Sequence, residues 1–153
     1  MFHRVTIIIL LAGLLVLPAA VTYADQKLDQ ALLKAAENGK PEQVNKLIAQ
    51  GADVNASDQN AMTALMKAAD KDHADCVKTL LAKDADVNAK DIIGMTALMY
   101  AADHGSADTV KALLAKGADV NAKDMIGFTA LKWAKVTNKT EIIQLLKQAG
   151  AKE

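Results

Sequence analysis

The sequence predicts an all-α solenoid, built from four stacked helix–turn–helix units that follow a short N-terminal export segment. A phrase reading GADVNA or DADVNA starts at residues 51, 84 and 117, and a shortened copy starts at 150, so the spacing is always 33 residues. A second phrase, T-A-L, starts at residues 63, 96 and 129 with the same period. Apolar residues make up 52% of the chain and aromatic residues only 3%, which favours closely packed helices. A repeated unit of this length is typical of a stacked array.

The first helix of each unit is predicted from a threonine start and an apolar face. A threonine before an alanine- and leucine-rich stretch can accept a hydrogen bond from the free amides of a helix start. These threonines are Thr63, Thr96 and Thr129. Leucine recurs at 32, 65, 98 and 131, with alanine three residues later, which predicts a shallow apolar face. Residues that tolerate a left-handed turn then follow, namely Gly39, Asp72, Gly105 and Asn138.

The second helix of each unit is predicted to start directly after that turn. Pro41 suits the first helical position, and each first turn carries an acid, as the helix dipole favours. The buried stripe repeats a β-branched residue and a leucine: Val44, Val77, Val110 and Ile143, with Leu47, Leu80, Leu113 and Leu146. Gly51, Asp84, Gly117 and Gly150 are expected to end these helices.

Together these phrases resemble the ankyrin repeat family over residues 26–153. The first unit departs from the pattern because it has no threonine phrase, and Gln59-Asn60-Ala61 lacks the glycine found at 94 and 127. The resemblance implies antiparallel helix pairs joined by β-hairpin loops that project sideways. It implies units of about 26–58, 59–91, 92–124 and 125–153, and a function in binding another protein.

The last unit is predicted to close the stack. Lys147 replaces Ile48, Leu81 and Leu114, and Lys135 replaces Ala36, Ala69 and Ala102. A terminal repeat needs a polar outer face because no neighbour covers it. We therefore expect a monomer with four units.

The N-terminus has the pattern of an export signal. His3 and Arg4 precede the apolar run 5–17, Pro18 follows, and Thr22-Tyr23-Ala24 places small residues at a cleavage site. We expect residues 1–24 to be removed, leaving the repeat domain 25–153 in the periplasm or secreted. The alternative is an uncleaved membrane anchor over 5–24, which is long enough to span a bilayer.

Composition and spacing argue against catalysis, cofactors, metals and nucleic acid. Charges balance at 18 basic and 18 acidic residues, and Arg4 is the only arginine, unlike a nucleic-acid-binding surface. His73 and His104 have no second ligand at a metal-binding spacing. Cys76 falls at a small core position, and Asp53, Asp86 and Asp119 are spaced for capping loops rather than for binding calcium. We therefore expect no enzyme activity.

Candidate protein-binding residues lie at the loop tips and on the adjoining helices. The tip positions are Gln59, Asn60 and Met62; Ile92, Ile93 and Met95; and Met125, Ile126 and Phe128. Apolar tips facing solvent would form an interaction patch, or else they pack on one another along the row of loops. The helix positions that vary between units are Lys67, Tyr100 and Trp133, with Asp70, Lys71, Asp103 and His104. Trp133 can equally shield the end of the core.

The leading hypothesis is thus a periplasmic protein-binding module that acts as a scaffold or modulator of an envelope partner. An immunity or inhibitor protein that blocks a toxin or enzyme is the alternative, and it would use the same surface. A small enzyme or metal carrier is disfavoured by the absence of a catalytic or ligand pattern.

Overall fold

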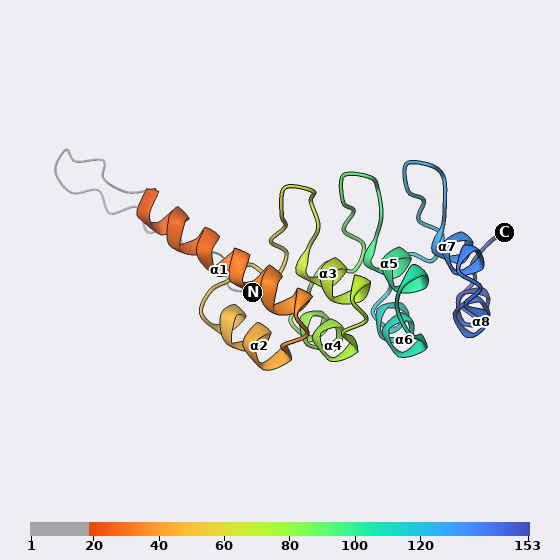
Figure 1. Cartoon of the computed structure of the whole chain (residues 1–153), viewed down its shortest axis with the longest axis horizontal. Coiled ribbons are helices and arrows are strands. Elements are labelled where there is room, and N and C mark those ends of the chain that lie inside the picture. Colours follow the sequence, from red (N-terminus) through yellow and green to blue (C-terminus); the bar gives the residue numbers. More distant parts are fainter. Residues whose placement is uncertain (1–18) are drawn as a thin grey trace.

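The computed structural model describes residues 19–153, and these form eight helices that pair in order into four units (Figure 1). The helices are α1 (Ala19–Glu37), α2 (Pro41–Ala49), α3 (Ala64–Asp70), α4 (Ala74–Ala82), α5 (Ala97–Asp103), α6 (Ala107–Ala115), α7 (Ala130–Val136) and α8 (Thr140–Gln148). The predicted all-α stack of helix–turn–helix units is confirmed. Regular β pairing in the described range is limited to one antiparallel bridge, between Ser57 and Thr63.

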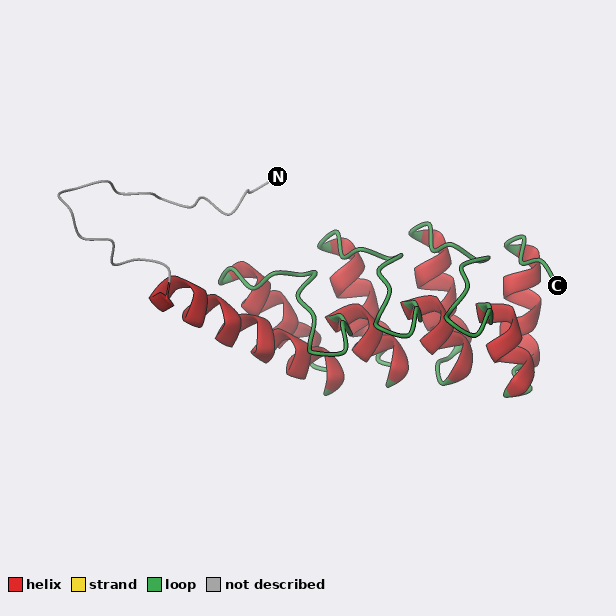
Figure 2. Ribbon diagram, turned by 90° about the horizontal axis from the view of Figure 1, so that it is seen from above, coloured by secondary structure: helices red, strands yellow, loops and turns green. Residues whose placement is uncertain are grey.

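The helices form two rows, with α1, α3, α5 and α7 in one and α2, α4, α6 and α8 in the other (Figure 1). Three long loops leave the first row in the same direction, and Figure 2 shows them running between successive units. We call them loop 1 (57–63), loop 2 (90–96) and loop 3 (123–129). The core lies between the rows and between neighbouring units. Its central leucines, Leu32, Leu65, Leu98 and Leu131, are at most 1% exposed, and each such burial contributes about 2 kcal/mol.

Helix starts follow the sequence prediction. The hydroxyl of Thr63 accepts from the Met66 amide at 3.3 Å, and Thr96 and Thr129 cap α5 and α7 in the same way at 3.4 Å. Each bond satisfies one of the amides that a helix start leaves without an intrahelical partner.

The turns between paired helices match the prediction at three of four positions. Gly39, Asp72 and Asn138 are left-handed, with φ of 65°, 55° and 56°. Gly105 is not among the residues with positive φ, and its amide bonds to the Ala101 carbonyl as in a continuing helix. A Cβ at Gly105 would lie 2.7 Å from that carbonyl oxygen. Glycine is needed there for close backbone approach, not for a left-handed turn.

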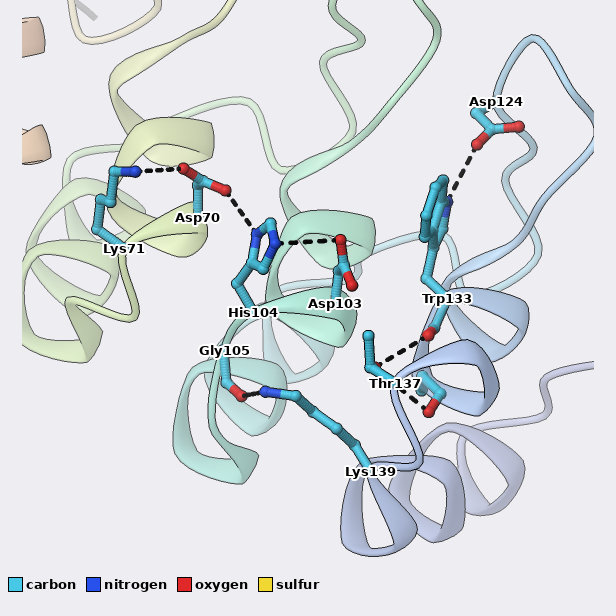
Figure 3. Close-up of polar contacts among 10 residues, drawn as sticks. Asp70, Lys71, Asp103, His104, Gly105, Asp124, Trp133, Thr137 and Lys139 are labelled. Carbon is cyan, nitrogen blue, oxygen red and sulfur yellow. Dashed lines mark hydrogen bonds and ion pairs between the residues drawn. The ribbon is translucent and has the colours of Figure 1, made fainter.

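Side chains from neighbouring units hold these turns together. Oδ1 of Asp72 accepts from the Ser106 amide at 2.9 Å and from the Thr109 hydroxyl at 2.7 Å. Lys139 donates to the Gly105 carbonyl at 2.8 Å (Figure 3). Burial alone would raise the pKa of Asp72, but the bonds from Thr109 and Ser106 and the charge of Lys139 lower it. The stack is therefore tied along its turn side by polar bonds as well as by its core.

Both ends of the described stack carry polar residues at positions that the middle units bury fully or partly. Lys135 and Lys147 are exposed, and both pair with Glu153, whose pKa they hold below its usual value. At the other end Gln43 is exposed, whereas its equivalents Cys76, Thr109 and Ile142 are buried. The predicted polar outer face of the last unit is confirmed.

Helix α1 extends beyond the predicted first unit, since it begins at Ala19 rather than near residue 26. The predicted cleavage point after Ala24 falls within this 19-residue helix, and cleavage there would leave Asp25–Glu37. The predicted apolar run 5–17 and Pro18 lie outside the described residues. Within the described range, no helix combines the length and apolar character that crossing a membrane requires.

Candidate protein-binding surface

One aspartate organises each loop. Oδ1 of Asp91 accepts hydrogen bonds from the amides of Ile93 at 3.0 Å and Met95 at 2.9 Å. Asp58 binds the amides of residues 60 and 62 in loop 1, and Asp124 binds those of residues 126 and 128 in loop 3. These bonds satisfy tip amides locally and give the three loops one shared conformation.

The second carboxylate oxygen of each aspartate is held by a side chain of the first-row helix that follows the loop. Lys67 contacts Asp58 at 2.8 Å, the Tyr100 hydroxyl donates to Asp91 at 2.6 Å, and the Trp133 indole donates to Asp124 at 3.0 Å (Figure 3). The amine of Lys67, the phenol of Tyr100 and the indole of Trp133 thus each hold the aspartate of a loop. In each loop, we call the aspartate, with its bonds to the two tip amides and to the helix side chain, the aspartate brace.

The aspartate brace changes the interpretation of residues 67, 100 and 133. They vary between units, as contact residues do, but each one holds its own loop and is partly buried. Sequence reasoning missed the three aspartates, although they recur every 33 residues and always lie nine residues before the donor. That constant separation was the signal that could have revealed them.

Contacts within the brace shift the pKa of two of its groups, Asp58 and Tyr100. Burial would raise the pKa of Asp58, but the bonds from Lys67 and from the amides of Asn60 and Met62 outweigh it and lower the pKa. Burial and the hydrogen bond to Asp91 raise the pKa of Tyr100, so its hydroxyl stays protonated and donates.

The loops are also bonded to one another. The Ile92 amide donates to the Asn60 carbonyl at 3.0 Å, and the Met125 amide donates to the Ile93 carbonyl at 2.9 Å. These two bonds form a loop ladder, in which each loop fixes the position of the next. A left-handed residue completes every tip: Ala61, Gly94 and Gly127, with φ of 58°, 79° and 79°.

Four apolar tip side chains face solvent in loops 2 and 3. Ile92, Ile93, Met125 and Ile126 are 59%, 49%, 75% and 67% exposed, and we call them the apolar tip patch. In loop 1 the corresponding tip residues, Gln59 and Asn60, are polar and exposed. The apolar tip patch joins two loops that are already linked through their backbones.

Three other apolar loop residues pack inward. Met95 is 6% exposed and belongs to the core, so the expectation that it faces solvent is wrong. Phe128 is half-buried against Trp133, with ring centroids 5.4 Å apart, and the Lys132 amine lies 4.8 Å from its ring centre. Met62 is half-buried and contacts the core. Contacts with the core and with α7 thus account for these three side chains and not for the apolar tip patch.

A chain of charged contacts lies at the C-terminal ends of α3 and α5, the ends opposite to those that loops 1 and 2 join (Figure 3). Asp70 contacts Lys71 at 3.1 Å and His104 at 2.7 Å, and His104 contacts Asp103 at 3.3 Å. The side chains of Lys71 and His104 are 53% and 55% exposed, whereas those of Asp70 and Asp103 are 19% and 17% exposed. A partner approaching this face would therefore meet mainly Lys71 and His104.

Trp133 packs against the core, as one of its two predicted roles requires, and it also holds loop 3. Its ring packs against the core and against Phe128, while its indole N–H holds Asp124. Beyond it, Val136 is 60% exposed and the Thr137 hydroxyl donates to the Trp133 carbonyl at 3.1 Å. Trp133 is thus mainly a residue that fixes loop 3.

Residues considered for chemistry have structural contacts. His73 bonds to the Glu37 carbonyl at 3.0 Å, and burial together with the charge of Asp75 raises the pKa of the Cys76 thiol. Oδ1 of each repeated aspartate, Asp53, Asp86 and Asp119, accepts from the amide two residues later at 2.9 Å, which confirms loop capping. Within residues 19–153, no three His, Cys, Asp or Glu side chains are placed to hold a metal ion.

The repeat pattern matches a known family. The family model described as ankyrin repeats (three copies) matches residues 32–124, more than half of the chain. A search of curated proteins finds no match.

Proposed function

Because this chain belongs to the ankyrin repeat family, whose repeats are protein–protein interaction modules, we propose that it is a non-catalytic binding module for one envelope protein. In this proposal it acts as a monomeric scaffold or modulator, and the apolar tip patch is the centre of its binding surface. Lys71 and His104, exposed at the C-terminal ends of α3 and α5, would contact the margin of the partner.

The observation that carries the proposal is the exposure of Ile92, Ile93, Met125 and Ile126 on two bonded loops. An exposed apolar patch on a soluble protein is a feature of interaction sites. The aspartate brace and the loop ladder hold both tips in place before binding. Such preorganisation supports the proposal, because ordering a flexible loop on binding would weaken the affinity.

The cellular location is a separate part of the proposal. The basic start, apolar run and small residues before Asp25 support export to the periplasm or medium, with cleavage after Ala24. Intact-mass measurement on protein from an envelope fraction should give a chain that starts at Asp25. A chain that retains Met1 in that fraction would instead support an N-terminal membrane anchor.

A double substitution tests the binding surface. Ile93→Ser with Ile126→Ser should leave helicity and Tm almost unchanged, because exposed substitutions rarely change stability by more than about 0.5 kcal/mol. Partner affinity should fall by at least about 30-fold for each residue, since loss of a central apolar anchor costs about 2 kcal/mol. Phe128 is left intact because it packs against Trp133.

The matched control is Lys46→Ser with Lys78→Ser, at exposed positions of α2 and α4 in the second row of helices. This control protein should bind the partner with wild-type affinity. Unchanged partner binding in a stable Ile93→Ser/Ile126→Ser protein would move the site to the helices. A one-to-one complex with subnanomolar Kd would assign the chain to the inhibitor class rather than to the scaffold class.

A further inference from the structure

Loop 1 differs from loops 2 and 3 in what lies on its N-terminal side. The amides of Ile92 and Met125 each donate to the carbonyl of a preceding loop. Gln59 occupies the equivalent position, and no residue within 19–153 accepts from its amide. Among residues 19–153, the first loop of the loop ladder thus has an amide donor without an acceptor.

Helix α1 supplies the hydrogen-bond acceptor that a preceding unit would supply to the segment before loop 1. It supplies no such acceptor to the tip of the loop. In later units, the side chains of Asn55, Asn88 and Asn121 accept from the amide 31 residues onward, at 2.7, 2.7 and 2.9 Å. For Asp53 this acceptor is Asp29 of α1, at 2.7 Å. A side chain of α1 therefore bonds to the segment that leads into loop 1, whereas within residues 19–153 no preceding loop lies beside the tip.

An open groove of ≈ 680 Å³ lies between α1 and the tip of loop 1. Gln26 and Gln30 line it from α1, Gln59 and Asn60 line it from the loop, and Leu33 adds apolar surface. Side-chain amides can both donate and accept, which matches the alternating groups of a polypeptide backbone. The volume lies within the range of ligand sites, about 300–1,000 Å³.

We propose that this groove binds an extended polypeptide segment of the partner, whose backbone carbonyl accepts from the Gln59 amide. The inference rests on the proposed function, because the segment belongs to the same partner that covers the apolar tip patch. The occupant would continue the loop ladder by one step and take the place that a preceding loop would fill.

The Gln59 amide donor favours an extended segment over a helix. The carbonyls of a helix are used within the helix except in its last turn. An extended segment has free carbonyls along its length, and adding such a segment at an exposed backbone edge gives affinity through main-chain hydrogen bonds. The amide side chains of Gln26 and Gln30 would hold its outer edge.

The probe for the test is a backbone-cyclised peptide with the sequence of residues 89–97, which is loop 2 itself. In the intact chain, the Ile93 carbonyl of this sequence already accepts from the equivalent amide of the next loop. Titration into the ¹⁵N-labelled protein should shift the Gln59 amide and slow its hydrogen exchange at least tenfold. A peptide with the same residues in scrambled order should do neither.

Filling the groove gives the second arm of the test. Gln30→Trp should lower the affinity for the peptide at least tenfold, whereas Gln43→Trp, at an exposed position of α2 outside the groove, should not. Peptide binding that leaves the Gln59 amide unchanged, equal affinity in the Gln30→Trp protein, or no binding at all would overturn the inference.

The two proposals fail separately. The Ile93→Ser/Ile126→Ser protein should still bind the cyclic peptide with wild-type affinity, although it loses the partner. If the peptide fails while partner binding still depends on the apolar tip patch, only the groove inference is overturned. If the peptide binds while the double serine variant keeps its partner, only the assignment of the patch is overturned.

Discussion

All three loops have the same hydrogen-bonded frame, but the tip of loop 1 differs from the tips of loops 2 and 3. In each loop an aspartate accepts from two tip amides and from one donor on the following helix. Loop 1 ends in Gln59 and Asn60, whereas the later loops end in exposed Ile and Met side chains. Because the frame forms with either kind of tip, folding does not require the apolar residues, and their exposure points to contact with a partner.

The largest difference between the loops should appear when the aspartate is removed. Asp91→Ala leaves two amides and the Tyr100 hydroxyl without their acceptor at a site that is 8% exposed, and should cost about 3 kcal/mol. Asp58→Ala should cost about 1 kcal/mol, because water reaches loop 1 more easily. Urea unfolding measures both values. Equal losses would mean that burial does not distinguish the two braces.

A methyl group added at the left-handed position of the tip should lower stability more in loop 2 than in loop 3. Both Gly94 and Gly127 have φ of 79°, so Gly→Ala should cost up to about 1 kcal/mol in either loop. At Gly94 the added Cβ would also lie 3.2 Å from the Asp124 Cα, whereas at Gly127 it would meet nothing within 4 Å. Thermal unfolding should therefore show a clearly larger loss for Gly94→Ala. A larger loss at Gly127 would contradict the spacing of the loop ladder.

The same position in loop 1 should respond in the opposite direction. Ala61 has φ of 58°, where a Cβ is unfavourable, so Ala61→Gly should stabilise the protein by about 0.5–1 kcal/mol. Differential scanning calorimetry would show this as a higher Tm. A lower Tm would mean that the added chain entropy of glycine in the unfolded state outweighs the relief of strain.

The smallest predicted effect is the pH dependence of the brace in loop 1. The pKa of Asp58 is lower in the folded state, so this carboxylate stabilises the fold above its unfolded pKa of about 3.9. That contribution is lost as the pH falls through the folded-state pKa. Lys67→Met should lower the stabilising contribution of the Asp58 carboxylate by about 0.5 kcal/mol, as for other partly exposed ion pairs. Unfolding curves at pH 7 and pH 3 should differ less in this variant than in the wild type.

The period of 33 residues was sufficient to predict the fold, because each unit repeats its caps and apolar positions in sequence. Thr63 and its equivalents cap helices as predicted, and Lys135 and Lys147 are exposed at the last unit. Gly105 was misread because a sequence does not distinguish a glycine needed for close approach from one needed for a left-handed turn.

The candidate site was only partly predictable, because the direction of a loop side chain depends on three-dimensional contacts. Ile93 and Met95 are both apolar and only two residues apart, yet one is exposed and the other is in the core. Tyr100 varies between units like a contact residue, but its partner is an aspartate of its own loop. The spacing between the two was visible, whereas the hydrogen bond required the structure.

Site-specific photo-crosslinking tests the central claim that the apolar tip patch contacts a partner protein. A photoreactive amino acid replaces either Ile93 or Lys78, an exposed residue of α4, in the full chain expressed in cells. We predict one dominant crosslinked partner from position 93 and none from position 78. Crosslinks from position 78 with none from position 93 would contradict the account.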